Sequence, residues 1–346
     1  MAAYTAIDDS EAYFNIVLYT GNAEDDSDTT QDITGVGFQS DMTWIKSRTE
    51  GNSHFINDSV RGANKALIVS GTNEEITSLR YLKSFASDGF QVGGDGIANA
   101  ENQNYVSWNW KASGSTASNS SGDITSTVDV DTTAGFSIVS YTGNGSDGAT
   151  LGHSLGTTPD MVIQKRRAGA TASWVVWHES IHDASSNDKV IYLNLNAASA
   201  SGASDAIGGV SSTLITTKGT GAVNPSSDTC IAYCFAAKQG WSKFGTYAGN
   251  GNANGAFIYT GFKPAVVIMK CSSDGATPWL IWDNKRPGYN VTNLRLRPDT
   301  SDDEDTSTAD PIDLLSNGFK CRGSNDDSNK SGSTYIYAAF AESPFV

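Results

Sequence analysis

The sequence predicts an all-β protein made of three tandem antiparallel β-sandwich domains, of jelly-roll or lectin-like type, related by internal repetition. Three observations support this fold class. Short runs rich in Val, Ile, Tyr, Phe, Trp and Thr are bounded by Gly, Asn, Asp or Ser, which is typical of strands joined by turns. Apolar residues at helical spacing are scarce. Four sequence blocks recur in the same order three times, which indicates repeated structural units.

The first block is a strand followed by a Gly-Asn turn, and the second is a strand that ends in lysine. The first block occupies residues 14–22, 136–144 and, more loosely, 244–250. The second occupies residues 38–46, 155–165 and 262–270. Its final residues are Lys46, Lys165 and Lys270, and each is either a strand-end residue in water or part of a salt bridge to Asp58 or Asp283 across a strand pair.

The third block lies 12 or 13 positions after each lysine, and the fourth block closes the repeat. The third block centres on Asp58, on Trp177-His178 and on Trp282-Asp283. The fourth block occupies residues 104–110, 229–235 and 334–340. The continuous apolar run at 266–269 predicts a strand covered on both faces. The helical spacing of Ile76, Leu79 and Leu82 predicts one short helix within residues 73–82.

These blocks set the predicted domain boundaries. Repeat 1 spans residues 1–111, repeat 2 spans 124–237 and repeat 3 spans 238–346. Residues 112–123 are rich in Ser and Gly, which predicts a flexible linker. Because the junction at 236–241 is short, we expect repeats 2 and 3 to pack rigidly and repeat 1 to move on its linker.

Charge and composition exclude several classes of protein. The 346 residues carry 23 Lys and Arg against 38 Asp and Glu, and a net charge of −15 argues against nucleic-acid binding. We expect no membrane association, because no segment approaches the ~20 apolar residues of a spanning helix. The start of the chain lacks the pattern of a secretory signal, which predicts synthesis in a cytoplasm. The four cysteines are expected to be free thiols.

The tryptophans of the third block are the first candidate for a binding site. Trp279, Trp282 and Asp283 in repeat 3 correspond to Trp174, Trp177 and His178 in repeat 2. An aromatic ring can cover the apolar C–H face of a sugar while a neighbouring polar group bonds its hydroxyls. The alternative is that a repeated tryptophan belongs to the core of each sandwich. The predicted glycan-binding residues are Trp177, His178, Trp279, Trp282, Asp283 and Tyr289.

Acidic segments are the candidates for a metal site, and besides the one predicted to bind calcium they include Asp25, Asp26 and Asp28, and Asp326-Asp327. Asp302, Asp303 and Asp305 lie in a run of carboxylates, and calcium takes oxygen ligands from such loops. The run does not match the spaced ligands of an EF-hand, so the alternative is a solvated acidic loop. No other cofactor is expected.

No catalytic set stands out, and we expect a protein that is not an enzyme. His178-Glu179 and His182 have the spacing of a zinc-binding helix, but the preceding residues predict a strand and no third ligand is evident. A nucleophile elbow and a phosphate-binding loop are also missing from the sequence. A carboxylate pair for glycoside hydrolysis is compatible with a sandwich, but no spacing selects one.

The motifs resemble a repeat family of tail, fibre and appendage proteins of marine tailed bacteriophages. The resemblance rests on residues 141–144, 261–264, 279–283 and 335–342, with the opening residues 4–14, and it covers nearly the whole chain. It implies lectin-like or laminin-G-like sandwiches in a virion component that is made in the host bacterial cytoplasm. It carries over no catalytic residue. Repeat 1 departs most, because Phe55-Ile56-Asn57-Asp58 replaces the tryptophan block.

Three hypotheses follow for function. The first is a tail fibre or appendage protein that binds a host cell-surface glycan, assembled as a homotrimer in which repeated weak contacts gain from multivalency. The second is a structural decoration or adaptor protein that packs against other virion proteins and binds no receptor. The third, less favoured, is a polysaccharide depolymerase.

Overall fold

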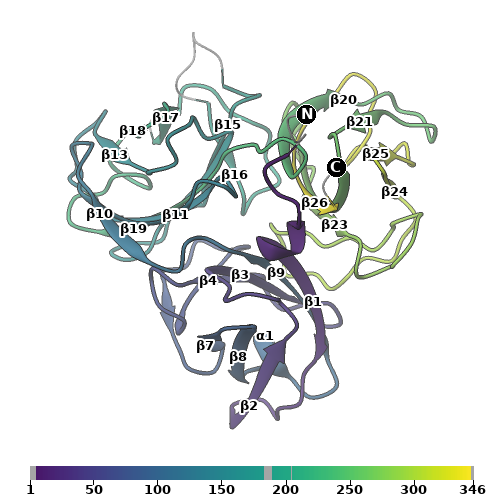
Figure 1. Ribbon diagram of the computed structural model, residues 1–346. Helices are drawn as coiled ribbons and strands as arrows, with labels where there is room; N and C mark the ends of the chain where they lie inside the picture. The colour runs from purple at the N-terminus through teal and green to yellow at the C-terminus, as the bar shows by residue number, and fades with distance from the viewer. Residues whose placement is uncertain (1–4, 183–188, 204, 344–346) are drawn as a thin grey trace.

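The computed structural model describes residues 5–182, 189–203 and 205–343, and the strands that they form pair antiparallel. Each third of the chain contributes one inner sheet and one three-stranded outer sheet. In Figure 1 the three thirds form three lobes around a common centre. The predicted all-β, antiparallel fold class is therefore confirmed. No helix in the described ranges is long and apolar enough to cross a membrane.

The first sandwich is built from the first third of the chain. Its inner sheet has the order β1 (Phe14–Thr20), β9 (Asn104–Trp110), β3 (Met42–Ser47), β4 (Phe55–Asp58), β5 (Lys65–Ile68) and β6 (Ile76–Thr77). Its outer sheet has the order β2 (Ser27–Thr34), β8 (Gly89–Gly94) and β7 (Leu82–Ala86). Two single-turn helices, η1 (Ser10–Ala12) and α1 (Gly96–Asn99), flank the strands.

The helix predicted within residues 73–82 does not form. The segment instead holds the two-residue strand β6, and Leu79 is 58% exposed. The Glu75 carboxylate bonds the guanidinium groups of Arg61 and Arg167, and these contacts fix the chain in an extended path.

The second sandwich follows the same plan. Its inner sheet has the order β10 (Thr116–Asn119), β11 (Ser126–Asp131), β12 (Phe136–Thr142), β19 (Thr229–Phe235), β14 (Met161–Arg166), β15 (Val175–His178) and β16 (Ile191–Tyr192). Its outer sheet has the order β13 (Thr150–Gly152), β18 (Leu214–Lys218) and β17 (Ala206–Val210).

Residues 112–123 are not a free linker, which corrects the expectation from their composition. Four of them form β10 and pair with β11. The backbone N–H of Ala112 donates to Asp41 at 2.8 Å, and the hydroxyl of Ser113 donates to Asp129 at 2.6 Å. Small polar residues occur both in exposed edge strands and in flexible linkers, so the composition of residues 112–123 does not distinguish these two structures.

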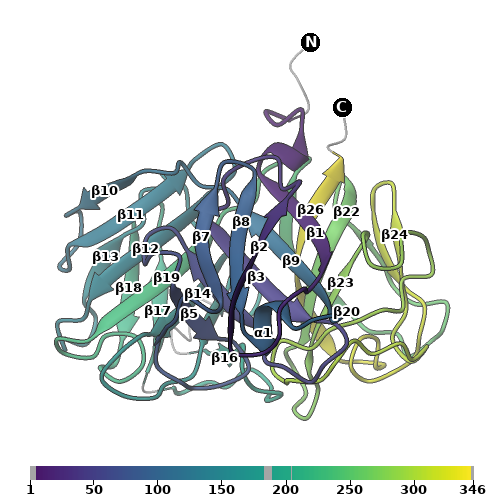
Figure 2. The ribbon, with the colours of Figure 1, turned by 90° about the horizontal axis from the view of Figure 1, so that it is seen from below.

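The third sandwich has the smallest inner sheet. Its order is β20 (Ser242–Ala248), β26 (Thr334–Ser343), β22 (Lys263–Cys271) and β23 (Trp279–Asp283). The outer sheet has the order β21 (Phe257–Tyr259), β25 (Gly318–Cys321) and β24 (Ile312–Leu315). The four cysteines are buried free thiols, as expected. In Figure 2 β26 ends near β1, and the Ser10 hydroxyl donates to Glu342 O at 2.6 Å.

The central strands of the inner sheets are buried on both faces. Side chains alternate along a strand, so Ile45 packs between the two sheets of its own sandwich while Trp44 points to the centre of the molecule. Val162 and Ile163 divide in the same way in β14. Trp44, Ile163 and Ile268 belong to one apolar cluster shared by all three thirds. The three sandwiches therefore share a central core in addition to the cores between their sheets.

Polar contacts close the three junctions between the sandwiches. Trp174 donates its indole N–H to Ile68 O, and Trp279 donates to Tyr192 O, both at 2.8 Å. Arg48 forms two bonds of 3.0 and 2.9 Å to Glu304, which joins the first sandwich to the third. Because all three junctions are closed, the first sandwich is fixed in place, which corrects the expectation that it moves on a linker. The tryptophan bonds at two of the junctions are of the same kind.

The three strand-end lysines are buried, so the expectation of solvated side chains is wrong. The alternative of a salt bridge to Asp58 or Asp283 is also not what forms, because these aspartates pair with arginines. Lys165 Nζ donates to Ala172 O at 2.8 Å and to Thr72 O at 3.2 Å in the neighbouring sandwich. Lys270 Nζ donates to Thr277 O at 2.7 Å and to Asn196 O at 3.3 Å in the second sandwich. Lys46, Lys165 and Lys270 have no exposed surface, and burial lowers the pKa of each to about 8.

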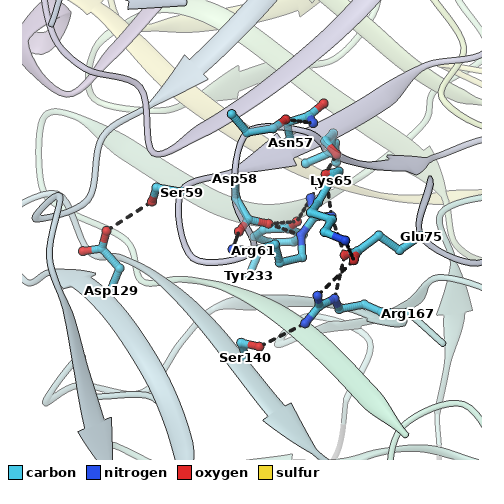
Figure 3. Close-up of polar contacts among 12 residues, drawn as sticks. Asn57, Asp58, Ser59, Arg61, Lys65, Glu75, Asp129, Ser140, Arg167 and Tyr233 are labelled. Atoms are coloured by element: carbon cyan, nitrogen blue, oxygen red, sulfur yellow. Dashed lines mark hydrogen bonds and ion pairs between the residues drawn. The ribbon is translucent and has the colours of Figure 1, made fainter. Parts of the chain in front are cut away.

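A buried ion network joins the first two sandwiches (Figure 3). The Arg61 guanidinium bonds Asp58, donates to Glu75 at 3.0 Å and donates to Ile56 O at 3.0 Å. Tyr233 of the second sandwich donates its hydroxyl to Asp58 at 2.7 Å, and Arg167 donates to Glu75 at 2.7 Å. Burial raises the pKa of Glu75, but the bonds from Arg167 and the charge of Arg61 outweigh it and hold that pKa below its usual value.

Replacing Arg61 is expected to destabilise the protein strongly. Arg61→Met leaves Asp58 buried without its ionic partner, and breaking a buried pair from one side costs about 3–5 kcal/mol. Equilibrium urea unfolding measures this loss. Arg80→Met is the matched control, because the ion pair of Arg80 with Asp26 is exposed and is worth about 1 kcal/mol or less. Equal losses in the two variants would contradict the assignment.

The buried lysines predict a distinctive pH dependence. The Lys270 pKa is about 8 in the folded protein and ~10.4 in an unfolded chain. Between these values the unfolded chain binds more protons, so the contribution of this site to stability rises with pH. The free energy of unfolding of the native protein, relative to that of Lys270→Met, should rise by roughly 3 kcal/mol between pH 7 and pH 10.5. Lys285→Met, at an exposed position, should show no such rise, and a flat difference for Lys270→Met would refute the prediction.

Candidate functional site

Five of the six residues predicted to bind a glycan lie in the interior. Trp177 is 6% exposed, and the other four, His178, Trp279, Trp282 and Asp283, are 1% exposed or less. None of them can stack on or bond a sugar at the surface. The sixth residue, Tyr289, is 81% exposed.

Three of the buried five, His178, Trp279 and Asp283, bond a neighbouring sandwich, whereas Trp177 belongs to the core of its own sandwich. Asp283 accepts bonds from the Arg286 guanidinium at 2.7 Å and from the indole of Trp108, in the first sandwich, at 3.1 Å. The His178 ring lies 3.2 Å from Tyr337 O of the third sandwich, and burial lowers its pKa to about 4. The repeated Trp-Asp block therefore marks the junctions and not a ligand site, as the core alternative proposed. His178 is also committed to these contacts and is not arranged as a metal ligand.

The acidic segment predicted to bind calcium is already neutralised in part by arginines. Asp305 bonds Arg295 at 2.7 Å and Arg297 at 2.9 Å, and Asp302 lies 3.4 Å from Arg297. Asp303 is exposed. Among the described residues, these three carboxylates do not form a group whose ligand atoms all lie within 4.8 Å of one another. A carboxylate group that does come together is Asp25, Asp26 and Asp95, with ligand atoms within 4.8 Å of one another.

A groove of about 270 Å³ surrounds Tyr289 in the third sandwich. It is lined by Lys263, Asn284, Gly288, Tyr289, Asn290, Thr292 and Leu314. Its wall is the segment that follows β23, and its far side is the outer strand β24. The predicted residue Tyr289 thus lies beside a concave surface.

The loop that carries Tyr289 is held to β24 on its C-terminal side. The Asn290 side chain donates to Leu314 O and accepts from Leu314 N–H, both at 2.8 Å, as a strand backbone would. Thr292 and Ile312 exchange backbone bonds of 2.8 and 3.0 Å. Gly288 adopts a φ of +74°, which a residue with a side chain rarely takes, and it turns the chain just before Tyr289. The aromatic ring is therefore presented to solvent by an anchored turn.

One buried polar atom among the described residues that line the groove has no hydrogen-bond partner. Within the described ranges, Asn284 Oδ1 is buried and accepts no hydrogen bond, although the backbone N–H of Asn284 donates to Ala265 O at 2.8 Å. Lys263 Nζ lies 2.6 Å from Glu342 on the rim. A buried acceptor without a donor costs free energy unless a ligand or water supplies one. An aromatic face beside an amide acceptor and an ammonium group suits a ligand that has both C–H faces and hydroxyls.

The apolar cavity at the centre of the molecule is not a comparable site. It holds only about 20 Å³ and lies among Trp44, Trp110, Ile163, Phe235 and Phe340. A small cavity lined by apolar groups stays dry and offers no polar group to orient a ligand.

Sequence reasoning named Tyr289 as a candidate, a prediction that stays open, and it did not name the polar residues that line the groove. Lys263, Asn284 and Asn290 come from segments that meet only in the folded chain. The available signal was the Gly288-Tyr289-Asn290 turn, which places an aromatic residue outside any strand pattern.

Comparison with known families places the chain in one of them. Residues 9–344 match a family described as a domain of unknown function, DUF7483, and the chain belongs to this family. The match spans all six sheets, so the family domain corresponds to the whole set of three sandwiches. No curated protein and no solved structure matches the chain.

The placement of the aromatic residues predicts opposite effects of two substitutions. Trp282→Ala removes a fully buried ring and should lower the free energy of unfolding by about 3–5 kcal/mol. Tyr289→Ala removes an exposed ring and should change it by about 0.5 kcal/mol or less. Urea unfolding of both variants tests the contrast. A stable Trp282→Ala variant would show that this ring is not part of the core.

Proposed function

We propose that the protein is a non-catalytic component of a bacteriophage tail fibre or appendage and that it binds a host cell-surface glycan in the Tyr289 groove. The observation that carries the proposal is the exposed ring of Tyr289, held by an anchored turn beside a buried, unsatisfied amide oxygen. The sequence resemblance to phage appendage proteins supports the setting, a virion assembled in the host cytoplasm. Trimerisation and contacts with other virion proteins stay predictions.

The lining of the groove favours binding over hydrolysis. Most glycoside hydrolases use two carboxyl groups that flank the scissile bond. The described residues that line the groove include no aspartate or glutamate, and nearby Glu342 is paired with Lys263. Elsewhere, Asp58 and Asp283 are buried against arginines, out of reach of a polysaccharide. These observations support a binding role and disfavour the depolymerase hypothesis.

A second candidate function is a structural adaptor within the virion. Phe257 and Tyr259 are 47% and 53% exposed on β21, at one edge of an outer sheet. Lys243 lies 5.4 Å from the centre of the Tyr259 ring. Aromatic side chains are enriched at protein interfaces.

Tyr289→Ala is expected to abolish most glycan binding without unfolding the protein. Loss of one aromatic stacking contact, worth about 1–1.5 kcal/mol, weakens binding roughly tenfold. The measurement is binding of the full chain to an array of bacterial surface polysaccharides, followed by titration with the strongest ligand. Tyr259→Ala is the matched control, because it removes another exposed ring that is not part of the groove lining.

Two results would contradict the glycan proposal. One is unchanged binding in Tyr289→Ala, and the other is an equal loss in Tyr259→Ala. If the native protein bound no polysaccharide and Tyr259→Ala prevented its incorporation into particles, the adaptor function would replace the proposal.

A further inference from the structure

We infer that the first sandwich contains a second saccharide-binding groove, specific for a neutral sugar, between β2 and the segment that leads into β7. The groove has a volume of about 440 Å³, within the range of about 300–1,000 Å³ that is typical of small-molecule sites. It lies in the lobe that carries β2, β7 and β8 in Figure 1, whereas the Tyr289 groove lies beside β24 in another lobe.

Two irregularities in strand pairing create this groove. β2 pairs with β8 at Ser27↔Gly94 and again from Gln31↔Val92, so three residues of β2 face the single residue Gly93. β7 has a shift of its own, because Leu82 pairs with Val92 and Ser84 pairs with Gln91. The sheet therefore opens at this end, and the backbone of residues 28–30 is withdrawn from the regular ladder.

Glycines form the floor of the groove. A Cβ atom on Gly93 would meet Leu79 O at 2.3 Å, and one on Gly94 would meet Ser27 O at 2.6 Å. Side chains there would push the two walls apart, so the walls can approach the floor only because these residues are glycines. The floor is consequently bare backbone, which leaves the space above it open to a ligand.

The walls carry groups that suit a polyol. Hydroxyls come from Ser27, Thr29, Thr30 and Ser78, and Leu79 adds an apolar side chain that is 58% exposed. Across the described part of the chain, neither Asp28 nor Lys83 has an ion-pair partner. A free carboxylate accepts bonds from sugar hydroxyls and a free ammonium group donates to them, while Leu79 can contact a C–H face.

The surrounding charges select a neutral ligand. The only other cation in the lining, Arg80, is paired with Asp26. Asp25, Asp26 and Asp95 gather close by, and the whole chain carries a net charge of −15. This field repels an anionic sugar, so we expect a neutral hexose unit of a polysaccharide and not a uronic acid.

Photolabelling tests this inference separately from the Tyr289 proposal. The probes are diazirine-bearing tetrasaccharides of glucose, galactose and mannose, with a uronic acid tetrasaccharide as the charged comparison. The full native chain should be labelled by a neutral probe on residues 27–30 or 78–83. The variant Asp28→Ala/Lys83→Ala should lose at least about tenfold of this label, because two charged hydrogen-bonding groups are removed.

The matched control is Tyr289→Ala, which should keep the label on residues 27–30 or 78–83. If Tyr289→Ala loses label only near position 289, the result bears on the proposed function and supports the separate groove in the first sandwich. The inference is overturned if the native chain takes no label in these segments, if Asp28→Ala/Lys83→Ala is labelled as strongly as the native chain, or if the uronic acid probe labels more strongly than the neutral ones.

Discussion

The burial of both faces of the inner sheets is the constraint on which the rest of the structure depends. A sheet that packs on one side against its own outer sheet and on the other against two neighbours has no wet face along its central strands. Any cation on such a strand must find acceptors in the interior. Lys46, Lys165 and Lys270 do so by donating to backbone carbonyls, and in the last two cases one of these carbonyls belongs to the neighbouring sandwich. Burying these ammonium groups costs free energy unless they are hydrogen-bonded, and the bonds that satisfy Lys165 and Lys270 also connect neighbouring sandwiches.

The sequence predicts the strands and their repeated order well, because alternation and turn residues are local signals. It does not predict which faces are covered. Trp279, for example, lies on the face of β23 that the second sandwich covers, where its indole bonds Tyr192 O, 87 positions away in the chain. The same limit applies to residues 112–123, where a polar edge strand and a flexible linker have similar composition. Local patterns identify elements, whereas burial is decided by contacts between elements.

The candidate site shows the same division. Tyr289 could be predicted because it is an aromatic residue in a turn, but its groove needs Asn290 to bond Leu314, a contact across 24 positions of the chain. Asn284 becomes an unsatisfied acceptor only because neighbouring segments remove it from water. A short sequence motif does not predict such a surface. Composition alone also does not distinguish buried aromatic residues from exposed ones.

Fusing three similar sandwiches in one chain has a consequence that a homotrimer of single sandwiches would not have. Each sandwich can keep the contacts that close the junctions while its surface loops differ. The opening between β2 and β8 in the first sandwich has no equivalent between β21 and β25 in the third, where the pairing is continuous. In the first and third sandwiches an aspartate pairs with the arginine three positions later. The corresponding residues of the second sandwich are His178 and Ile181, which cannot form such a pair. A shared core therefore permits unlike surfaces at fixed separations. In the proposed saccharide-binding role, a rigid body with two different grooves would bind at two points without the entropic cost of ordering a hinge.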